Sequence, residues 1–421
     1  MVINRNINEI IRLNRLISSY SLTKIVNEMA KYGAFINDTS TFSRCETGKL
    51  SFKIEDIVAF YKVLGIEYDE EIIEELDTEI SCLFLEFLDN YFYGKSNESV
   101  LDRLDRIGDK VRMSSCYAKF LIIEMDNFLV TNTDSAVMYK YEKSLLDIEK
   151  SLSFEEKQLL YDTLGCFYFS KKDYQKALSY YDEAERYSDK LFIAKVLYHK
   201  SMILDKTGKL NDALEVIKQA KTIFDDYCCY SRSIASLIQR AKIESKMFDY
   251  SKAIENYYLS LKAAENLQLY TYYPLIYSNL CWVYIRKHEY DKIIEVCETM
   301  IDKNFNQAST YLYLSWAYKK MNNLEKAKSM ISIAKDFITS STKPLHILEI
   351  DLYEKILSGK ASKKQIINQF NKIDTYFETQ EVDYSNELFV LELRKDYFLE
   401  LGDDPSAIFV MQRTLDILQN K

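Results

Sequence analysis

The sequence predicts a protein built almost entirely of helices. Its 421 residues include only nine glycines and three prolines, whereas the two together average roughly 12% of a protein chain. Sandwiches, barrels and doubly wound sheets need many tight turns rich in these residues, so such folds are nearly excluded. Hydrophobic residues are 48% of the chain and charged residues 28%, which is ample for a large globular core.

The same composition argues against a membrane span, secretion and catalysis. No apolar run approaches the ~18 residues of a membrane span, and the opening stretch MVINRNINEIIRLNR lacks the apolar region of a signal peptide. The eight cysteines are scattered, and the three histidines (199, 288 and 346) do not stand at metal-ligand spacing. No phosphate-binding glycine loop or nucleophile elbow is present. We therefore expect a cytoplasmic protein that is not an enzyme and has no metal or cofactor.

Residues 1–68 form a distinct head of short predicted helices, at 3–17, 22–32, 39–46 and 54–64. The segment TSTFSRCETGKL, from Thr39, carries the string S-x-x-S-R-x-E-x-G-K. It resembles the helix-turn-helix of the phage-repressor type, which inserts the N-terminal half of its recognition helix into the major groove of DNA. The resemblance implies DNA contacts from Thr39, Ser40, Thr41, Ser43, Arg44 and Lys49.

Other residues of this segment have structural reasons to be there. Asn37 or Asp38 can cap the recognition helix, and Gly48 can end it. We expect Glu46 to pair with Arg15 on the first helix. The stretch before the recognition helix is about three residues longer than in typical members, which leaves the register of the turn open. The head carries a net charge of only +2 against −11 for the remainder, so a helical cap without DNA contact is the alternative.

A repeat follows the head. Counted from Gln158 as position 1, small residues occupy positions 8, 20 and 27, and large residues occupy positions 4, 7, 11 and 24 (Gly165, Ala177, Ala184; Tyr161, Leu164, Tyr168, Tyr181). This pattern resembles the tetratricopeptide repeat, in which small residues let two antiparallel helices approach closely. Further copies start at 194, 234, 274 and 308, and a degenerate copy starts near 388.

The remaining segments read as helical pairs that match the template weakly. They cover residues 77–157 and 335–387, so about eight pairs run from 77 to 421. The predicted fold is all-α, with a helix-turn-helix domain (1–68), a linker (69–76) and a right-handed tetratricopeptide superhelix with a concave inner face (77–421).

The combination of head and repeats resembles the RRNPP family, named after the Rap, Rgg, NprR, PlcR and PrgX types of Gram-positive bacteria. Length and repeat number are most similar to the NprR-like and clostridial RstA-like members, which control sporulation, secreted enzymes or toxins. The resemblance implies a homodimer that binds promoter DNA and responds to a short re-imported signalling peptide in quorum sensing.

The concave face supplies the candidate peptide site. Its positions are 2, 5, 6, 9, 12 and 13 of each first helix, and an amide there can both donate to and accept from a peptide backbone. The candidate residues combine amides, aromatic rings and positive charges: Gln239, Lys242, Lys246, Asn279, Trp282, Arg286, Tyr313, Trp316 and Lys320. Packing between neighbouring repeats is the alternative role for Trp282 and Trp316.

Two functions remain open at this point. The first is a DNA-binding transcription factor controlled by a peptide. The second is a protein-interaction scaffold that sequesters a signalling or phosphorelay protein through its repeats, as some relatives do. A DNA mobility-shift assay separates the two.

Overall fold

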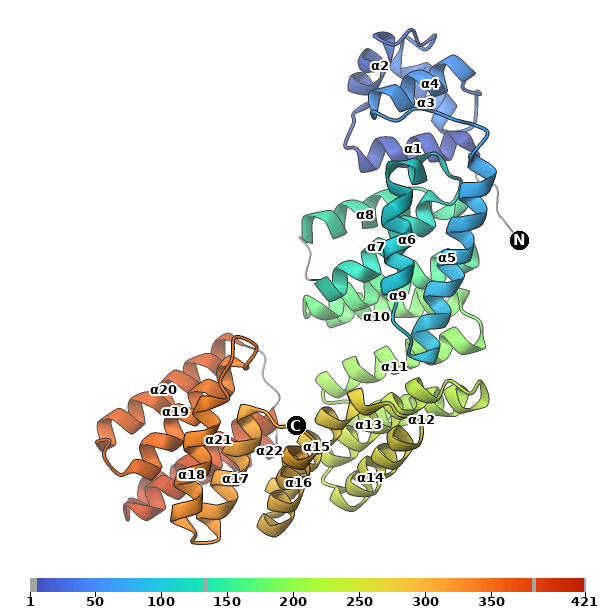
Figure 1. Ribbon diagram of the computed structural model, residues 1–421. Coiled ribbons are helices and arrows are strands. Elements are labelled where there is room, and N and C mark those ends of the chain that lie inside the picture. The colour runs from blue at the N-terminus through green and yellow to red at the C-terminus, as the bar shows by residue number, and fades with distance from the viewer. Residues whose placement is uncertain (1–5, 132–134, 381–383, 420–421) are drawn as a thin grey trace. The chain divides into compact units, whose positions relative to one another are not determined.

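The computed structural model describes residues 6–131, 135–380 and 384–419, and it confirms the all-α prediction (Figure 1). Within these ranges every regular element is a helix and there is no strand. The chain divides into two compact units, Met1–Ser236 and Leu237–Lys421. Each is described by itself.

The first unit contains the head and the first helical pairs. The head comprises α1 (Ile7–Ile17), α2 (Leu22–Ala30), α3 (Thr39–Glu46) and α4 (Ile54–Val63). It is followed by α5 (Ile73–Tyr93), α6 (Glu98–Ile107), the 3-10 turn η1 (Gly108–Met113), α7 (Tyr117–Thr131), α8 (Ser135–Asp147), η2 (Glu149–Ser151), α9 (Phe154–Ser170), α10 (Tyr174–Tyr187), α11 (Lys190–Lys206) and α12 (Leu210–Asp226).

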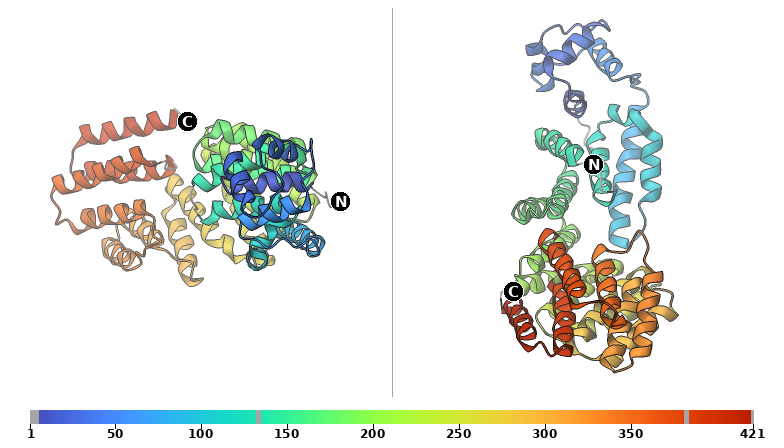
Figure 2. Two further views of the ribbon diagram at one scale, coloured as in Figure 1. Left: turned by 90° about the horizontal axis from the view of Figure 1, so that it is seen from above. Right: turned by 90° about the vertical axis from the view of Figure 1, so that its left-hand side faces the viewer.

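The second unit contains the remaining repeats, and the boundary between the units falls inside α13 (Tyr230–Lys246). Its helices, which Figure 2 shows from two further sides, are α14 (Tyr250–Asn266), η3 (Tyr270–Tyr272), α15 (Tyr273–Lys287), α16 (Tyr290–Asp302), α17 (Ala308–Lys320), α18 (Leu324–Asp336), α19 (Pro344–Ser358), α20 (Lys363–Thr379), α21 (Tyr384–Glu400) and α22 (Asp404–Gln419).

The five predicted repeat copies from 158 to 334 and the degenerate copy near 388 each fold as a helical pair, α9–α10 through α17–α18 and α21–α22. The weakly matching stretches are also helical, as expected. Position 15 lies between the two helices of each copy and adopts a left-handed backbone with φ between 56° and 76°: Lys172, Gly208, Phe248, His288, Asn322 and Gly402. Only two of the six are glycine, which explains how so many turns form in a glycine-poor chain.

The small residues of the template lie where the paired helices meet. Gly165 on α9 faces Tyr181 on α10, and a Cβ added to Gly165 would lie 2.3 Å from the ring carbon Cε1. The small residues at the same position of the next four copies are fully buried: Ser201, Ala241, Cys281 and Ser315. Close approach at this position therefore sets the spacing of each helical pair.

After α4 the chain resumes helical structure at Ile73, inside the stretch 69–76 for which a linker is predicted. The head and the first repeats lie in one compact unit, Met1–Ser236. No helix in the described part of the chain is long and apolar enough to cross a membrane.

The contact between Gly165 and Tyr181 leads to a stability prediction. Gly165→Ala should lower the free energy of unfolding by about 1–3 kcal/mol, because the fully buried Tyr181 ring must shift to admit the methyl group. Urea denaturation followed by circular dichroism measures this loss.

Ser201→Ala is the matched control at the same position of the next copy. It removes only a hydroxyl that donates to the Tyr198 carbonyl, at 2.6 Å, and should cost less than about 1 kcal/mol. Equal losses in the two variants would contradict the proposed role of Gly165.

Candidate functional site

The head presents the predicted DNA-contacting residues on an accessible surface. Thr39, Ser40, Arg44 and Lys49 are exposed, and Thr41 and Ser43 are half-buried. Within the described ranges, Arg44 and Lys49 form no ion pair, so both cations are available to an outside partner. α3 begins at Thr39 as predicted, because the Asp38 side chain accepts the Thr41 backbone N–H at 2.8 Å.

The interior of the head fixes the orientation of α3. The Arg15 guanidinium donates to both carboxylate oxygens of Glu46, at 2.6 and 2.9 Å, and both side chains are largely buried. This bridge from α1 to α3 confirms the predicted pairing. Phe42 is fully buried, and Gly48 ends the helix with a φ of +72°.

A buried carboxylate anchors the long segment before α3. Asp56 of α4 accepts the backbone N–H groups of Phe35 and Ile36 on Oδ1, at 2.7 and 2.9 Å. It also accepts the Lys53 N–H on Oδ2, at 3.3 Å. The extra residues are thus anchored to α4 without displacing the predicted start of α3.

The head is attached to the body of the first unit through η1. The Arg112 carbonyl accepts from Asn14 Nδ2 at 2.8 Å and from the Tyr61 hydroxyl at 3.0 Å. The Arg112 guanidinium donates in return to Asn14 Oδ1 at 2.9 Å and to Ser18 Oγ at 2.5 Å. These hydrogen bonds join α1 and α4 to η1, so more than the linker holds the head in place.

The second unit contains the candidate peptide site, and α15 carries its most open part. Asn279, Trp282 and Arg286 are half-buried and follow one another at helical spacing. The Asn279 amide makes no hydrogen bond with any residue that the structure describes, and Arg286 forms no ion pair there. These two polar groups therefore keep their capacity to bind a ligand.

The placement expected for Tyr313 and Trp316 is wrong. Both rings are buried, at 4% and 1% exposure, where an open groove was expected. Phe389 of α21 lies against them and against Trp282, with ring centroids 5.7, 5.7 and 5.6 Å away. The inner face of α17 is therefore part of the core of the second unit, and packing is the role of Trp316.

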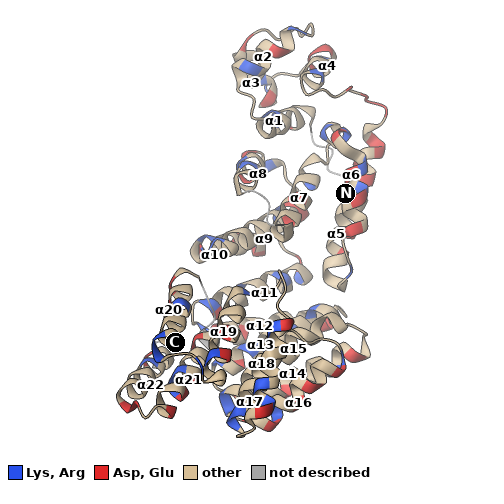
Figure 3. Cartoon of the chain, turned by 60° about the vertical axis from the view of Figure 1, so that its left-hand side comes forward, with Lys and Arg blue, Asp and Glu red and all other residues tan. Residues whose placement is uncertain are grey.

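The expectation that Lys320, at the end of α17, offers a free positive charge to a ligand is also wrong. Figure 3 shows basic residues gathered in this region. Lys320 Nζ lies 2.6 Å from an oxygen of Asp396 and 3.5 Å from one of Glu392, both on α21. Burial lowers the pKa of Lys320, but the two carboxylates raise it above its usual value overall. Lys320 is thus paired within its own unit.

The three candidates on α13 differ in accessibility. Lys242 is half-buried, whereas Gln239 and Lys246 are buried, at 8% and 9% exposure. The Gln239 amide nitrogen has no hydrogen-bond partner among the described residues. Together with Asn279, it leaves two amides on successive first helices with bonding capacity to spare.

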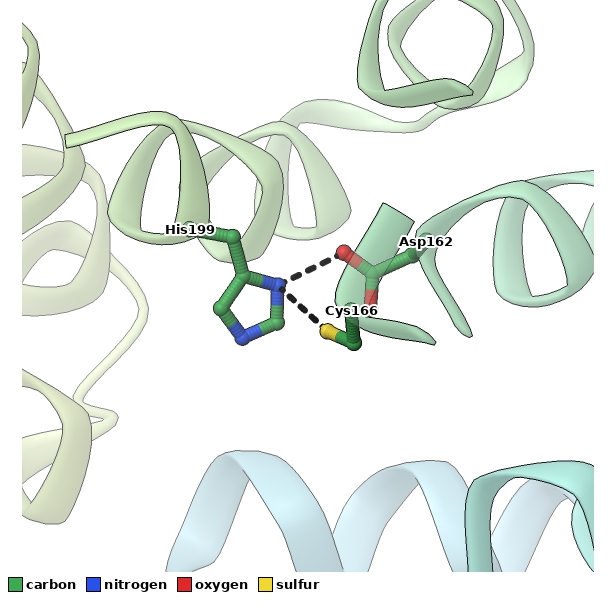
Figure 4. A group of neighbouring side chains, drawn as sticks. All are labelled: Asp162, Cys166 and His199. Atoms are coloured by element: carbon green, nitrogen blue, oxygen red, sulfur yellow. Dashed lines mark hydrogen bonds and ion pairs between the residues drawn. The ribbon is translucent and has the colours of Figure 1, made fainter. Parts of the chain in front are cut away.

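A polar cluster in the first unit was missed by the sequence analysis. Figure 4 shows Asp162 and Cys166 of α9 beside His199 of α11. His199 Nδ1 lies 2.8 Å from Asp162 Oδ1 and 3.6 Å from Cys166 Sγ. From the sequence alone, His199 is set aside because the three histidines do not stand at metal-ligand spacing. The four-residue spacing of Asp162 and Cys166 on one helix was the available signal, since both then share a face.

Comparison with known proteins supports the repeat assignment. The family model described as "Tetratricopeptide repeat" matches residues 160–190 and 194–227, which fall in the first two predicted copies. A curated relative, the transcriptional activator NprA of Geobacillus stearothermophilus, is 23% identical over 304 residues, covering 67% of this chain and 71% of NprA. Its role agrees with the expectation of a regulator rather than an enzyme.

Solved structures share the fold over most of the chain. The apo form of RapI has a TM-score of 0.63 at 15% identity and covers 82% of this chain and 98% of its own. The apo quorum sensor NprR from B. thuringiensis has a TM-score of 0.56 at 14% identity, covering 83% and 99%. The Rap conjugation gene regulator of plasmid pLS20, in complex with the Phr* peptide, has a TM-score of 0.50 at 13% identity, covering 81% and 96%. The chain therefore shares the fold of these Rap and NprR structures and is similar to NprA over two thirds of its length, which agrees with the resemblance of its head and repeats to the RRNPP family.

Proposed function

We propose that this chain is a DNA-binding transcriptional regulator whose activity is controlled by a short signalling peptide bound on the concave face of its repeats. The observation that carries the DNA-binding part is the accessible polar face of α3, where Arg44 and Lys49 are exposed and without ion pairs in the described structure. The role of NprA as a transcriptional activator supports the same assignment.

The peptide part rests on α15. Asn279 offers an unused amide, Trp282 an apolar wall and Arg286 a positive charge on one half-buried face. An extended peptide of roughly five to ten residues can pair its backbone with the amide and its carboxylate with the guanidinium. The plasmid-encoded Rap regulator, which shares this fold, was solved with a peptide.

A scaffold that sequesters a signalling protein is the other function considered. A scaffold does not require an exposed recognition helix with free cations, so the head favours DNA. Selection of genomic fragments on the immobilised full-length chain tests this directly. Failure to enrich any fragment would contradict DNA binding and favour the scaffold.

Substitutions in the head should separate specific from general DNA contacts. Arg44→Ala should lower affinity for the selected operator by about 1–3 kcal/mol, roughly 5- to 150-fold. Lys49→Ala should weaken binding to all DNA sequences alike. It should also reduce the slope of log affinity against log salt concentration by about the amount that one phosphate contact contributes. Mobility shifts at several salt concentrations measure both effects.

Lys62→Ala is the matched control, because Lys62 is an exposed cation of the same head on α4 rather than α3. It should leave operator affinity nearly unchanged. If folded Arg44→Ala binds the operator as tightly as the wild type, the proposed recognition face is wrong.

Asn279 is the decisive residue for peptide recognition. Asn279→Ala should reduce peptide affinity by about 1–3 kcal/mol while leaving thermal stability and basal DNA binding unchanged, because the amide has no partner within its unit as described. Fluorescence anisotropy with labelled peptides from short open reading frames beside the gene measures the effect.

Asn371→Ala is the matched control, since Asn371 is an exposed asparagine on α20. Its peptide affinity should equal that of the wild type. A normal peptide response in Asn279→Ala would remove Asn279 from the site.

The last helix described, α22, carries an apolar stripe that fits a second copy of the chain. Ile408, Met411 and Leu415 recur at helical spacing and are 62%, 39% and 50% exposed. A dimer would also double the weak +2 charge of the head on a two-fold DNA site. We infer that α22 contributes to a homodimer interface.

Charge introduced on this stripe should prevent dimerisation. Ile408→Glu combined with Leu415→Glu should convert a dimer to a monomer in light scattering at micromolar concentration, because the interface would bury two unpaired carboxylates. Leu85→Glu, at an exposed leucine of α5, is the control and should remain dimeric. A wild-type monomer under these conditions would contradict the proposal.

A further inference from the structure

The cluster on α9 and α11 brings three different donor atoms to one point. Asp162 and Cys166 occupy inner-face positions 5 and 9 of the first repeat, and His199 occupies inner-face position 6 of the second. A carboxylate oxygen, the thiol sulfur and an imidazole nitrogen all lie within 4.8 Å of one another, and Figure 4 shows the three side chains pointing toward one another. Asp162 is fully buried, and the His199 side chain is 14% exposed.

The imidazole of His199 has two polar neighbours on the same side of its ring. His199 Nδ1 faces both Asp162 Oδ1, at 2.8 Å, and Cys166 Sγ, at 3.6 Å. A single ring nitrogen has one hydrogen or one lone pair and cannot serve both neighbours well. The same convergence of nitrogen, oxygen and sulfur is what a metal ion requires of its ligands.

The spacing is near that of a tetrahedral zinc site. Zinc–ligand distances of about 2.0–2.3 Å place neighbouring ligand atoms about 3.3–3.6 Å apart. The Nδ1–Sγ separation of 3.6 Å already fits, and Asp162 Oδ1 needs to retreat from His199 by about 0.5 Å.

A second layer of contacts orients two of the three ligands. Lys195 Nζ lies 2.9 Å from Asp162 Oδ2, which leaves Oδ1 directed at the shared point. The Tyr181 hydroxyl donates to Cys166 Sγ at 3.3 Å. Metal ligands in proteins are commonly held by such outer partners.

The charge of the cluster is compatible with a divalent cation. The Asp162 carboxylate lies between two basic side chains, with Lys195 Nζ at 2.9 Å and His199 Nδ1 at 2.8 Å. A divalent cation that replaces one proton on His199 and one on Cys166 leaves the total charge of the buried site unchanged.

We propose that Asp162, Cys166 and His199 form a zinc site that joins the first helices of two consecutive repeats. The mixed oxygen, sulfur and nitrogen donor set selects Zn²⁺ over Mg²⁺ or Ca²⁺, which prefer oxygen ligands alone. Binding releases one proton from His199 and one from Cys166. The fourth coordination position is left for water. This inference is independent of the proposed regulatory function.

Cobalt substitution tests the site in the full-length chain. Metal-free protein titrated with Co²⁺ should develop the absorption of a thiolate–cobalt bond at one ion per chain, and Zn²⁺ should abolish it. Zn²⁺ should also raise the thermal unfolding midpoint of the wild type, since it binds the folded state. Absence of the thiolate–cobalt absorption would overturn the proposal without recourse to any variant.

Variants then assign the ligands. Cys166→Ser and His199→Gln should each lower Zn²⁺ affinity at least 100-fold, and Lys195→Met should lower it 10- to 100-fold through the outer contact. Cys82→Ser and His288→Gln change an exposed cysteine and an exposed histidine elsewhere and should bind like the wild type. Circular dichroism establishes that each variant is folded. A thiolate–cobalt band that persists in folded Cys166→Ser would overturn the assignment.

Discussion

The close approach of paired helices at the small residues of each repeat is the constraint on which the rest of the structure depends. Gly165 leaves no room for a methyl group beside Tyr181, and the corresponding residues of the next four copies are fully buried. Because this contact recurs, each helical pair presents its first helix in the same way to the next pair of its unit. The polar cluster of the first unit and the peptide candidates of the second unit stand at inner-face positions that repeat spacing defines.

Local sequence patterns were sufficient to predict the elements of the fold. The head helices and the repeat pairs could be predicted from caps, glycines and periodic small residues. Each of these signals affects only the few residues around it in the sequence. The start of α3 is capped by Asp38, the residue directly before it, and the bridge from Arg15 to Glu46 links helices of the same small module. The anchoring of the longer segment by Asp56 could not be predicted, because that carboxylate lies 20 residues further along the chain.

The candidate site was predicted less completely, because burial on the inner face depends on distant helices. Trp316 stands at an inner position by repeat spacing, yet Phe389 covers it from a helix more than 70 residues away. The sequence alone suggests that Lys320 is a free cation, but an oxygen of Asp396 lies 2.6 Å from its Nζ. The same limitation hid the cluster around His199, whose partners belong to a different helix. Position within the repeat identifies the inner face, but only tertiary packing decides which of its residues remain accessible.

The inner-face residues thus differ from helix to helix in whether other side chains pair with them, cover them or leave them accessible. On α9 and α11, Asp162 pairs with both Lys195 and His199. The inner-face residues of α17 are covered by rings and carboxylates of α21. On α15, Asn279 remains half-buried with an amide that none of the described residues engages. This amide keeps both its donor and its acceptor available to a ligand. A peptide backbone offers the complementary acceptor and donor, so a ligand site on the second unit is best centred on α15 rather than spread along all its repeats.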